Sequence, residues 1–477
     1  MMDSTLRQAQ NSPQVDSTLR QAQSSPQKVS IVSLGCSKNL VDSELILGSL
    51  KNAGYEISSE KEADLIVVNT CGFIADAKKE SINTIIELSQ YKHHGNCKKL
   101  IVTGCLVERY ADELKRELPE VDAFWGTGDL LKIGEVLGRK KIKKIHKSTP
   151  GTLYDPDSPR VLTTLPHTAY VKVSEGCSRT CSFCIIPKLR GLMKSRPADS
   201  IVGEVRNLAN LGVKEINLIA QDMTSYGRDI GTNLENLLRE LVKVDGIKWM
   251  RLLYCYPWGF TDSLVRLIAE EEKILNYIDM PLQHINDRIL KLMDRGTTSA
   301  RIRNIIDKLR KEIPNLTLRT TFIVGFPSET EEEFKELLDF AEEAQFERAG
   351  AFKHSQEEGT KAGEIPHQIP EEVKEERYER LLEVQSEVSL NKNRTLIGTT
   401  HKCFIEGTEN GNYIARIPSQ APEVDGVTYI SGSPKTLPPD SYPRSQRNKR
   451  LKVSDLVKVS ITDADIYDLF GEIVSTD

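Results

Sequence analysis

The chain has 477 residues, too many for one compact core, so two to four domains are expected. Its 39% hydrophobic and 28% charged residues are typical of a soluble globular protein, and no apolar run approaches the roughly 20 residues of a membrane helix. The net charge of −5 argues against a strongly electrostatic hold on nucleic acid.

Residues 1–27 are predicted to be a disordered tail. The segment DSTLRQAQ at 3–10 recurs at 16–23, the composition is polar, and the apolar stretch of a signal peptide is missing. Without an export signal, we expect a cytoplasmic protein whose nine cysteines stay reduced. That environment favours metal, cluster or catalytic roles for the cysteines over disulfides.

Residues 28–138 repeat one pattern three times: an apolar, β-branched run ends in a cysteine, and a helical stretch follows. The runs are VSIVSLGC, DLIVVNTC and KLIVTGC, which end at Cys36, Cys71 and Cys105, here called the strand-end trio. Strands that alternate with helices predict a parallel α/β domain. Because the carboxyl ends of parallel strands share one edge of the sheet, the three thiols are able to converge on one site.

Residues 139–165 are first basic and then rich in Pro and Asp, which predicts an interdomain linker. Residues 166–395 resume the alternation of strands and helices at a larger scale. The strand candidates are AYVKVSEGC, EINLIAQD, WMRLLYCYP, YIDMPLQ, LRTTFIVGFP and AGAFKHS. Six parallel strands predict a partial α/β barrel, which a charged helix from Glu371 to about Asn393 completes.

Residues 396–477 change character. Short strand-like runs, separated by Gly, Pro and Asn, predict a small all-β barrel. Residues 434–450 interrupt this pattern and are predicted to form a flexible loop.

The sequence GCSRTCSFC places Cys177, Cys181 and Cys184, here called the loop trio, at CxxxCxxC spacing directly after a predicted strand. A structural zinc site normally has four protein ligands, and no second cysteine pair lies nearby. Three thiolates suit a 4Fe–4S cluster with one open iron. An open iron can chelate S-adenosylmethionine (SAM), whose sulfonium C–S bond an electron from the cluster then breaks. Three buried cysteines at chance spacing are the alternative.

The strand-end trio carries a weaker signal, because scattered cysteines often merely pack in a core. The shared position after each strand is what favours a joint site. Cys97, Cys255 and Cys403 lack such a position, and we predict that they are buried or incidental thiols.

Five further residues are candidate SAM contacts. Phe183 lies between two cysteines of the loop trio and would either approach the adenine or pack as a loop aromatic. Gln221, Gln283 and Arg319 lie in or after predicted strands, where polar groups face a barrel interior and either bind SAM or satisfy backbone groups. Gly325 in FIVGFP either lets the adenine approach the backbone or forms an ordinary strand-end turn.

Nine strings between about residues 29 and 474 carry a resemblance to a known family: LGCSKNLVDSE, VNTCGFI, GCLVERY, EGCSRTCSFCIIP, AQDMTSYG, RLLYCYP, DMPLQHINDRILKLMDR, RTTFIVGFPSETEEEF and APEVDG. Together they resemble the methylthiotransferase family, in particular the branch that modifies an aspartate of small-subunit ribosomal protein twelve (RimO-type). The departures from the family pattern are Ser37, Lys194, Ser328, His354 and the insertion at 434–450, and none of them is a predicted cluster ligand.

The resemblance implies that the strand-end trio holds an auxiliary 4Fe–4S cluster, that the loop trio holds the cluster that cleaves SAM, and that residues 396–477 form a TRAM domain. One SAM molecule would supply the methyl group, and a second would supply the radical that removes hydrogen from the aspartate β-carbon. The implied cofactors are therefore two 4Fe–4S clusters and SAM. The implied partners are ribosomal protein twelve, a reductant such as flavodoxin or ferredoxin, and a sulfur donor.

The main rival is a tRNA (adenosine) methylthiotransferase. By the same resemblance, such an enzyme would share both clusters and the TRAM domain. Residues 396–477 contain nine Lys or Arg against eleven Asp or Glu, whereas a barrel that binds tRNA should be basic. An acidic barrel suits a basic ribosomal protein. The basic stretch RSQRNKRLK at 444–452 keeps nucleic-acid contact open as a secondary interaction. A non-catalytic iron–sulfur or RNA-binding module is the third alternative.

Overall fold

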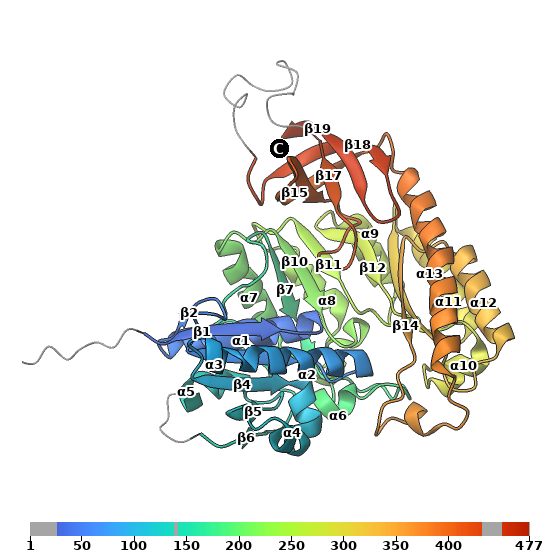
Figure 1. Cartoon of the computed structure of the whole chain (residues 1–477). Helices are drawn as coiled ribbons and strands as arrows, with labels where there is room; N and C mark the ends of the chain where they lie inside the picture. Colours follow the sequence, from blue (N-terminus) through green and yellow to red (C-terminus); the bar gives the residue numbers. More distant parts are fainter. Residues whose placement is uncertain (1–25, 138–141, 432–450, 477) are drawn as a thin grey trace, which may run out of the picture.

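The computed structural model of the chain describes residues 26–137, 142–431 and 451–476. An N-terminal α/β domain, a central α/β domain and a C-terminal β barrel follow one another, and the barrel lies at the top of Figure 1. This architecture confirms the predicted fold class. Most of the predicted tail and the whole predicted loop at 434–450 lie outside the described residues.

The N-terminal domain is a parallel sheet of six strands in the order β2-β1-β3-β4-β5-β6. The strands are β1 (Lys28–Ser33), β2 (Glu56–Ile57), β3 (Leu65–Thr70), β4 (Lys99–Gly104), β5 (Ala123–Trp125) and β6 (Ile145–His146). The helices are α1 (Ser37–Asn52), α2 (Ala75–Ser89), α3 (Tyr91–His94), α4 (Cys105–Glu117), the single 3-10 turn Leu130–Lys132 and α5 (Ile133–Leu137). Helices α2 and α4 pack on one face of the sheet, and α1 and α5 pack on the other. Strands that are covered on both faces need apolar, β-branched residues at nearly every position, which is what made them recognisable.

Strand β6 lies within residues 139–165, which the composition predicted to be a linker. Ile145 pairs with Phe124 of β5 and so adds a short edge strand to the N-terminal sheet.

The central domain is a second parallel sheet of six strands, in the order β14-β13-β12-β11-β10-β7. Its strands are β7 (Thr168–Lys172), β10 (Glu215–Ile219), β11 (Trp249–Leu252), β12 (Ile274–Asp279), β13 (Thr317–Val324) and β14 (Arg348–Lys353). A separate antiparallel pair joins β8 (Ser174–Glu175) to β9 (Lys194–Ser195). The helices are α6 (Ile186–Arg190), α7 (Ala198–Asn210), α8 (Leu234–Leu241), α9 (Asp262–Glu270), α10 (Asp287–Leu292), α11 (Ser299–Glu312), α12 (Glu331–Ala344) and α13 (Glu371–Arg394), with 3-10 turns at Met223–Ser225, Arg228–Ile230 and Ala362–Glu364. All six predicted strands are present and parallel, and the sheet is open rather than closed.

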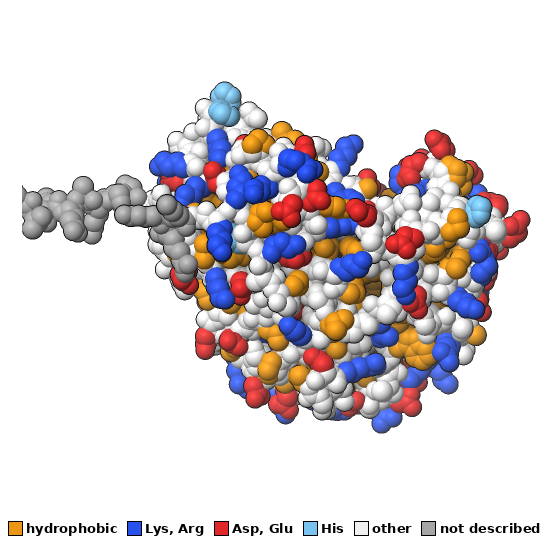
Figure 2. Space-filling model, turned by 90° about the horizontal axis from the view of Figure 1, so that it is seen from below, with side chains coloured by type: hydrophobic (Ala, Val, Ile, Leu, Met, Phe, Trp, Pro, Cys, Tyr) orange, Lys and Arg blue, Asp and Glu red, His pale blue; other side chains and the backbone are white. Residues whose placement is uncertain are grey.

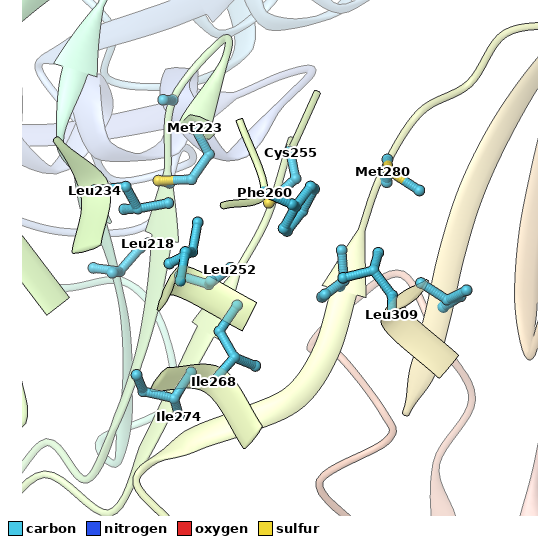
Figure 3. Packing of buried hydrophobic residues seen from close by; sticks show 14 of the residues in the cluster. Leu218, Met223, Leu234, Leu252, Cys255, Phe260, Ile268, Ile274, Met280 and Leu309 are labelled. Carbon is cyan, nitrogen blue, oxygen red and sulfur yellow. The ribbon is translucent and has the colours of Figure 1, made fainter. Parts of the chain in front are cut away.

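Alternate side chains of the central strands point to opposite faces of the sheet. On one face, Leu218 and Leu252 pack with Leu234 of α8 and Ile268 of α9, as Figure 3 shows. Cys255 is buried in the same cluster beside the strand ends. Cys97 and Cys403 are also buried, as predicted for the three incidental thiols.

The other face of the central sheet is covered by parts of both neighbouring domains. Val41 and Leu45 of α1 belong to the same buried cluster as Tyr277 of β12, and so does Phe404 of the C-terminal barrel. Helix α1 therefore lies between the two sheets and contributes to both domains, as Figure 1 also shows.

The C-terminal domain is a closed five-stranded barrel with the strand order β15-β16-β17-β19-β18. Its strands are β15 (Thr400–Glu409), β16 (Asn412–Arg416), β17 (Thr428–Ile430), β18 (Leu456–Ala464) and β19 (Leu469–Thr476). They match the predicted strand-like runs HKCFIEG, NYIARI, VTYIS, LVKVSITDA and LFGEIV. Glu215 of β10 joins the barrel to the central domain, because Arg416 contacts it at 2.5 Å and Arg251 at 3.3 Å. All three side chains are buried, so the two domains share a dry ionic contact.

On the face of the molecule seen in Figure 2, which is viewed from below and lies away from the barrel, Lys and Arg side chains are mixed with Asp and Glu. Among the described helices, none combines the length and the apolarity needed to span a membrane.

Candidate active site

The strand-end trio lies at one edge of the N-terminal sheet, where β1, β3 and β4 are neighbours. Cys36 directly precedes α1, Cys71 directly follows β3, and Cys105 opens α4. Gly35 has a φ of +85°, and a Cβ atom at this position would lie 2.7 Å from the Cβ of Cys71. Only glycine tolerates both the left-handed backbone and this close approach of the two cysteine-bearing segments.

Asn39, in the first turn of α1, ties these segments together. Its side-chain amide donates to the carbonyl oxygens of Leu34 at 2.9 Å and Thr70 at 3.1 Å, just before the first two cysteines. Asn69 in turn donates to the carbonyl oxygen of Asn39 at 2.8 Å. Because these amides are buried, their bonds hold the segments at fixed positions.

The loop trio lies between β8 and α6. The amide of Cys184 donates to the carbonyl oxygen of Cys181 at 3.0 Å, which forms a tight turn within the trio. Between them, the hydroxyl of Ser182 donates to Leu292 at 2.7 Å, and its amide donates to Met293 at 2.9 Å. The loop is thereby anchored to the end of α10.

Burial makes two thiols of each trio poor acids: Cys71 and Cys105 in the strand-end trio, and Cys177 and Cys184 in the loop trio. It raises the pKa of Cys71 to about 12, and the two other thiols of the strand-end trio act in the same direction. It likewise raises the pKa of Cys184 to about 12, again with its trio partners acting in the same direction. These mutual effects show that each trio is gathered at one place. A thiolate at either place needs a bound cation, so metal binding releases protons.

The donor sets fit iron–sulfur clusters. Each trio offers three thiols, and among the described residues no three His, Cys, Asp or Glu side chains are arranged to hold a single metal ion. Three thiolates on one zinc ion would lie roughly 3.8 Å apart, as Zn–S bonds of 2.3 Å require. A more open set of three thiols suits a cluster of several irons.

Each trio accepts a hydrogen bond from its own buried arginine, which donates to one of the three thiols. The Nε of Arg190, the last residue of α6, lies 3.4 Å from the sulfur of Cys105. The Nη1 of Arg295, just after α10, lies 3.5 Å from the sulfur of Cys181. Hydrogen bonds to ligand sulfurs and nearby positive charge tune the reduction potential of an iron–sulfur cluster, so both arginines suit such a site.

Arg190 also belongs to a buried ionic network that crosses from α1 to the central domain. Asp42 of α1 contacts Arg190 at 2.5 Å and Lys172 at 2.7 Å, and Lys172 contacts Glu175 at 2.5 Å. Burial opposes ionisation of Glu175, but Lys172 and Arg190 hold its pKa at about 2. Gln221, one of the predicted SAM contacts, donates to Glu175 at 2.8 Å. The network therefore connects the strand-end trio to the end of β10.

Two other predicted contacts are Arg319, within β13 beside the end of β12, and Gln283, just beyond β12. The guanidinium of Arg319 contacts Asp279 at 3.0 Å and Asp425 of the barrel at 3.7 Å, so it forms internal ion pairs. Gln283 has a φ of +78°, and its backbone bonds to Thr321 and Ile323 of β13. A left-handed glutamine is strained, and such strain clusters at functional sites.

Gly325 and Phe183 take up structural positions. Gly325 has a φ of +68°, and a Cβ there would lie 2.3 Å from the Cγ of Lys374. Phe183 packs against a hydrophobic cluster that contains Ile289 and Phe326. For both residues, the contact with SAM stays a prediction.

Several residues of this site were not predicted. Asn39 and Arg295 lie within quoted strings, but they and Arg190 have partners far along the chain that the sequence does not reveal. Lys38 lies within the quoted string LGCSKNLVDSE, and its place two residues after a predicted ligand was the signal available; the structure shows that it is buried. Burial lowers the pKa of Lys38 to about 8.

Three family models match successive parts of the chain. They are the uncharacterized protein family UPF0004 over residues 28–126, the radical SAM superfamily over 171–341 and the TRAM domain over 397–474. The radical SAM match implies a 4Fe–4S cluster and SAM for the central domain.

Curated relatives resemble the chain over nearly its whole length. The ribosomal protein uS12 methylthiotransferase RimO of Geotalea uraniireducens is 49% identical, and the match covers 94% of this chain and 98% of that protein. The protein of the same name from Geobacter sulfurreducens is 48% identical over 94% and 99% of the two chains. Among solved structures, the radical S-adenosylmethionine methyltransferase TsrM of Kitasatospora setae aligns with a TM-score of 0.52 at 14% identity, covering 82% of this chain and 81% of that one. This last likeness concerns the fold alone.

The identity and coverage of these relatives confirm the predicted family. The chain belongs to the RimO family of radical S-adenosylmethionine methylthiotransferases.

Proposed function

We propose that this enzyme replaces a hydrogen on the β-carbon of an aspartate of ribosomal protein uS12 with a methylthio group. The observation that carries the proposal is the contact between α6, which follows the loop trio, and Cys105 of the strand-end trio. Arg190 of the central domain donates to Cys105 of the N-terminal domain at 3.4 Å, six residues after the loop trio ends. Cys105 also packs with Ile185 and Leu189, which follow the loop trio directly, so this contact brings the two trios close together.

In this proposal the loop trio holds the cluster that binds SAM, and the strand-end trio holds a second 4Fe–4S cluster. When bound, these groups supply a carbon radical and a sulfur atom, which protein side chains cannot provide. The chain's own residues bind, orient and shield. Asn39 fixes the segments that carry Cys36 and Cys71, and Ser182 anchors the loop trio.

The buried side chains of the domain contact also exclude water from that side of the site, and a carbon radical needs such shielding. The domain contact consists of an apolar cluster and of the network of Asp42, Lys172, Glu175 and Arg190, all of which are buried. The network balances two cations against two carboxylates, so it adds no net charge beside the clusters.

The choice of target is supported by the barrel and by the relatives. Within the described residues of the barrel, 396–431 and 451–476, four Lys or Arg stand against nine Asp or Glu. Exposed carboxylates include Glu409, Asp463, Asp465 and Glu472. An acidic surface suits a basic ribosomal protein and repels the phosphates of tRNA. The curated relatives are named for uS12.

The test is a reconstituted reaction under strict exclusion of oxygen. The enzyme is supplied with SAM, sulfide and a chemical reductant, and receives uS12 and bulk tRNA in separate vessels. Mass spectrometry should find the methylthio mass on an aspartate-containing peptide of uS12 and none on tRNA nucleosides. A gain on tRNA alone would establish the rival activity. The absence of 5′-deoxyadenosine under strong reduction would indicate a binding module instead. Replacing the chemical reductant with flavodoxin or ferredoxin then tests the predicted electron donor.

A further inference from the structure

Lys38, the second residue of α1, is a buried cation without an anionic partner. Only 6% of the surface of Lys38 is exposed to solvent. Three lysines are buried in the part of the chain that the structure describes, and two of them, Lys172 and Lys374, contact a carboxylate. For Lys38 no ion pair or hydrogen bond is found among the described residues; its ammonium stands over the ring of Tyr254, 2.7 Å from the centroid.

An unpaired ammonium in a protein interior is unfavourable, and an aromatic face compensates for only part of the lost hydration. Asp279 is the carboxylate that raises the pKa of Lys38 most, but Asp279 is already engaged by other groups. Asp279 accepts from the amide of Tyr254 at 2.9 Å and from Arg319 at 3.0 Å. The place beside Lys38 therefore suits a carboxylate that comes from outside the chain.

The surroundings of Lys38 are held in a strained conformation. Tyr254 has a φ of +62°, which is rare for an aromatic residue, and its hydroxyl is within 3.3 Å of the Ser37 hydroxyl. The turn after β11 thus keeps the Tyr254 ring against α1, at the carboxyl edge of the central strands. Open α/β sheets bind their ligands at this edge.

We propose that Lys38 binds the side-chain carboxylate of the target aspartate. This inference rests on the proposed function. The β-carbon that accepts sulfur is bonded directly to the carboxylate carbon, so the carboxylate must lie within a few ångströms of the sulfur donor. Lys38 is two residues from Cys36 of the strand-end trio, where the sulfur is held in the proposal.

This arrangement makes Lys38 a specificity-determining residue for the substrate. A carboxylate beside the ammonium restores the interaction that burial removed, and a charge-assisted hydrogen bond orients the β-carbon. An adenosine base has no anion at its reacting carbon, so it gains nothing from Lys38. The position therefore favours an aspartate over a nucleoside.

The experiment compares Lys38→Met and Lys38→Arg with wild type on two substrates, uS12 and uS12 whose target aspartate is replaced by asparagine. Asparagine keeps the shape and the β-carbon but loses the charge. Lys51→Met is the matched control, because Lys51 lies on the same helix and is exposed. The readouts are kcat/KM for methylthiolation, 5′-deoxyadenosine formed without uS12, the KM for SAM, and electron paramagnetic resonance spectra of the clusters.

Wild type should prefer aspartate over asparagine by about 10- to 100-fold, the range of a hydrogen bond to a charged group. Lys38→Met should lose most of this preference by slowing only the aspartate reaction. Lys38→Arg should keep part of it, and Lys51→Met should keep all of it. Cluster spectra and the KM for SAM should stay at the wild-type values in every variant.

An undiminished preference for aspartate in Lys38→Met would overturn the inference. A raised KM for SAM with the preference intact would assign Lys38 to the carboxylate of SAM instead, and altered cluster spectra with the preference intact would assign it to the cluster. If Lys38→Met fails to assemble its clusters, the wild-type enzyme still decides, because equal rates on the two substrates would refute a cationic contact. Absence of product on uS12 with wild type would refute the proposed function itself.

Discussion

The two cysteine trios are assembled in opposite ways. The loop trio occupies residues 177–184 of one loop, whereas the strand-end trio is gathered from three strand ends between residues 36 and 105. The geometry of the first depends on one turn and its anchor on α10, and that of the second depends on the order of β1, β3 and β4 in a sheet. A short motif can thus be recognised by spacing, but a dispersed site becomes visible only when the topology is known. Substitutions in the two trios should therefore have different effects on SAM cleavage and on methylthiolation.

The largest effect is expected from removing one thiol of each trio. Cys181→Ala should abolish both 5′-deoxyadenosine formation and methylthiolated product, because the loop trio is the proposed SAM site. Cys71→Ala should spare part of the 5′-deoxyadenosine formation while ending methylthiolation. Chromatography of the nucleoside and mass spectrometry of uS12 measure the two outcomes. Product formation at the normal rate by Cys71→Ala would remove the second cluster from the proposal.

A buried charge cluster remote from both trios provides the next comparison. Glu215→Gln leaves Arg416 and Arg251 without their shared carboxylate and should lower the free energy of unfolding by about 3–5 kcal/mol. Glu240→Gln, which removes an exposed pair with Lys243, should change it by less than about 1 kcal/mol. Urea unfolding measures both. The iron content of the Glu215 variant should equal that of wild type at low temperature, and loss of one cluster would contradict the separation of the barrel contact from the trios.

The ionic contact at Glu215 also makes the free energy of unfolding depend on pH. Burial opposes ionisation of Glu215, but Arg416 and Arg251 hold its pKa at about 2, well below the ordinary value of 4.5. A depressed carboxyl pKa stabilises the folded state above pH 4.5, and this contribution is lost as the pH falls from about 4.5 towards 2. The difference in unfolding free energy between wild type and Glu215→Gln should therefore narrow over this window. A difference that stays constant between pH 5 and pH 3 would contradict the assignment.

A smaller effect is expected at the glycine that separates two thiol-bearing segments. Gly35→Ala adds a Cβ atom 2.7 Å from that of Cys71, in addition to the left-handed strain. It should reduce the iron bound at the strand-end trio and leave the loop trio intact. Gly54→Ala is the matched control, since Gly54 has a φ of +93° with no atom within 4 Å of an added Cβ, and should cost only about 1 kcal/mol. Iron analysis combined with spectra of each cluster distinguishes the variants, and equal iron loss in both would contradict the clash.

The smallest effect concerns the two arginines. Arg190→Lys should lower the reduction potential of the strand-end cluster by roughly 50 mV, which corresponds to about one hydrogen bond for one electron. Arg295→Lys should do the same to the loop cluster. Potentiometric titration followed by electron paramagnetic resonance reports each cluster separately. Each substitution should shift the potential of its own cluster only. A shift of the same size in the other cluster would contradict the assignment of one arginine to each site.

The predictable part of the fold consisted of long, buried strands. All six central strands and all five barrel strands follow runs of apolar and β-branched residues, because both faces or alternate faces of these strands are covered. Strands β2 and β6 were missed because they contain two residues each and exist only through pairing with a neighbour. The same holds for the pair of β8 and β9. A two-residue strand has no periodicity to recognise.

At the site, the six cysteines were predictable as thiols at strand ends and in one loop, but their supports were not. Arg190 lies 85 residues from Cys105, and Arg295 lies 114 residues from Cys181. Such contacts depend on the tertiary fold and, for Arg190, on the packing of two domains, which local sequence does not encode. Arg319 illustrates the reverse difficulty: its polar character was noticed, but its partners were not. Asp279 lies on the neighbouring strand, and the pair with Asp425 depends on the docking of the barrel.

Helix α1 is shared by the N-terminal core and by the contact with the central domain. Its apolar residues serve the N-terminal core and the contact with the central sheet, while Asp42 enters the ionic network between the domains. A helix that two domains share cannot leave one of them without exposing the core of the other, so the usual freedom of adjacent domains to swing apart is lost. The first two domains should therefore unfold in a single cooperative transition, and a chain cut between them should yield two fragments that aggregate rather than two domains that fold.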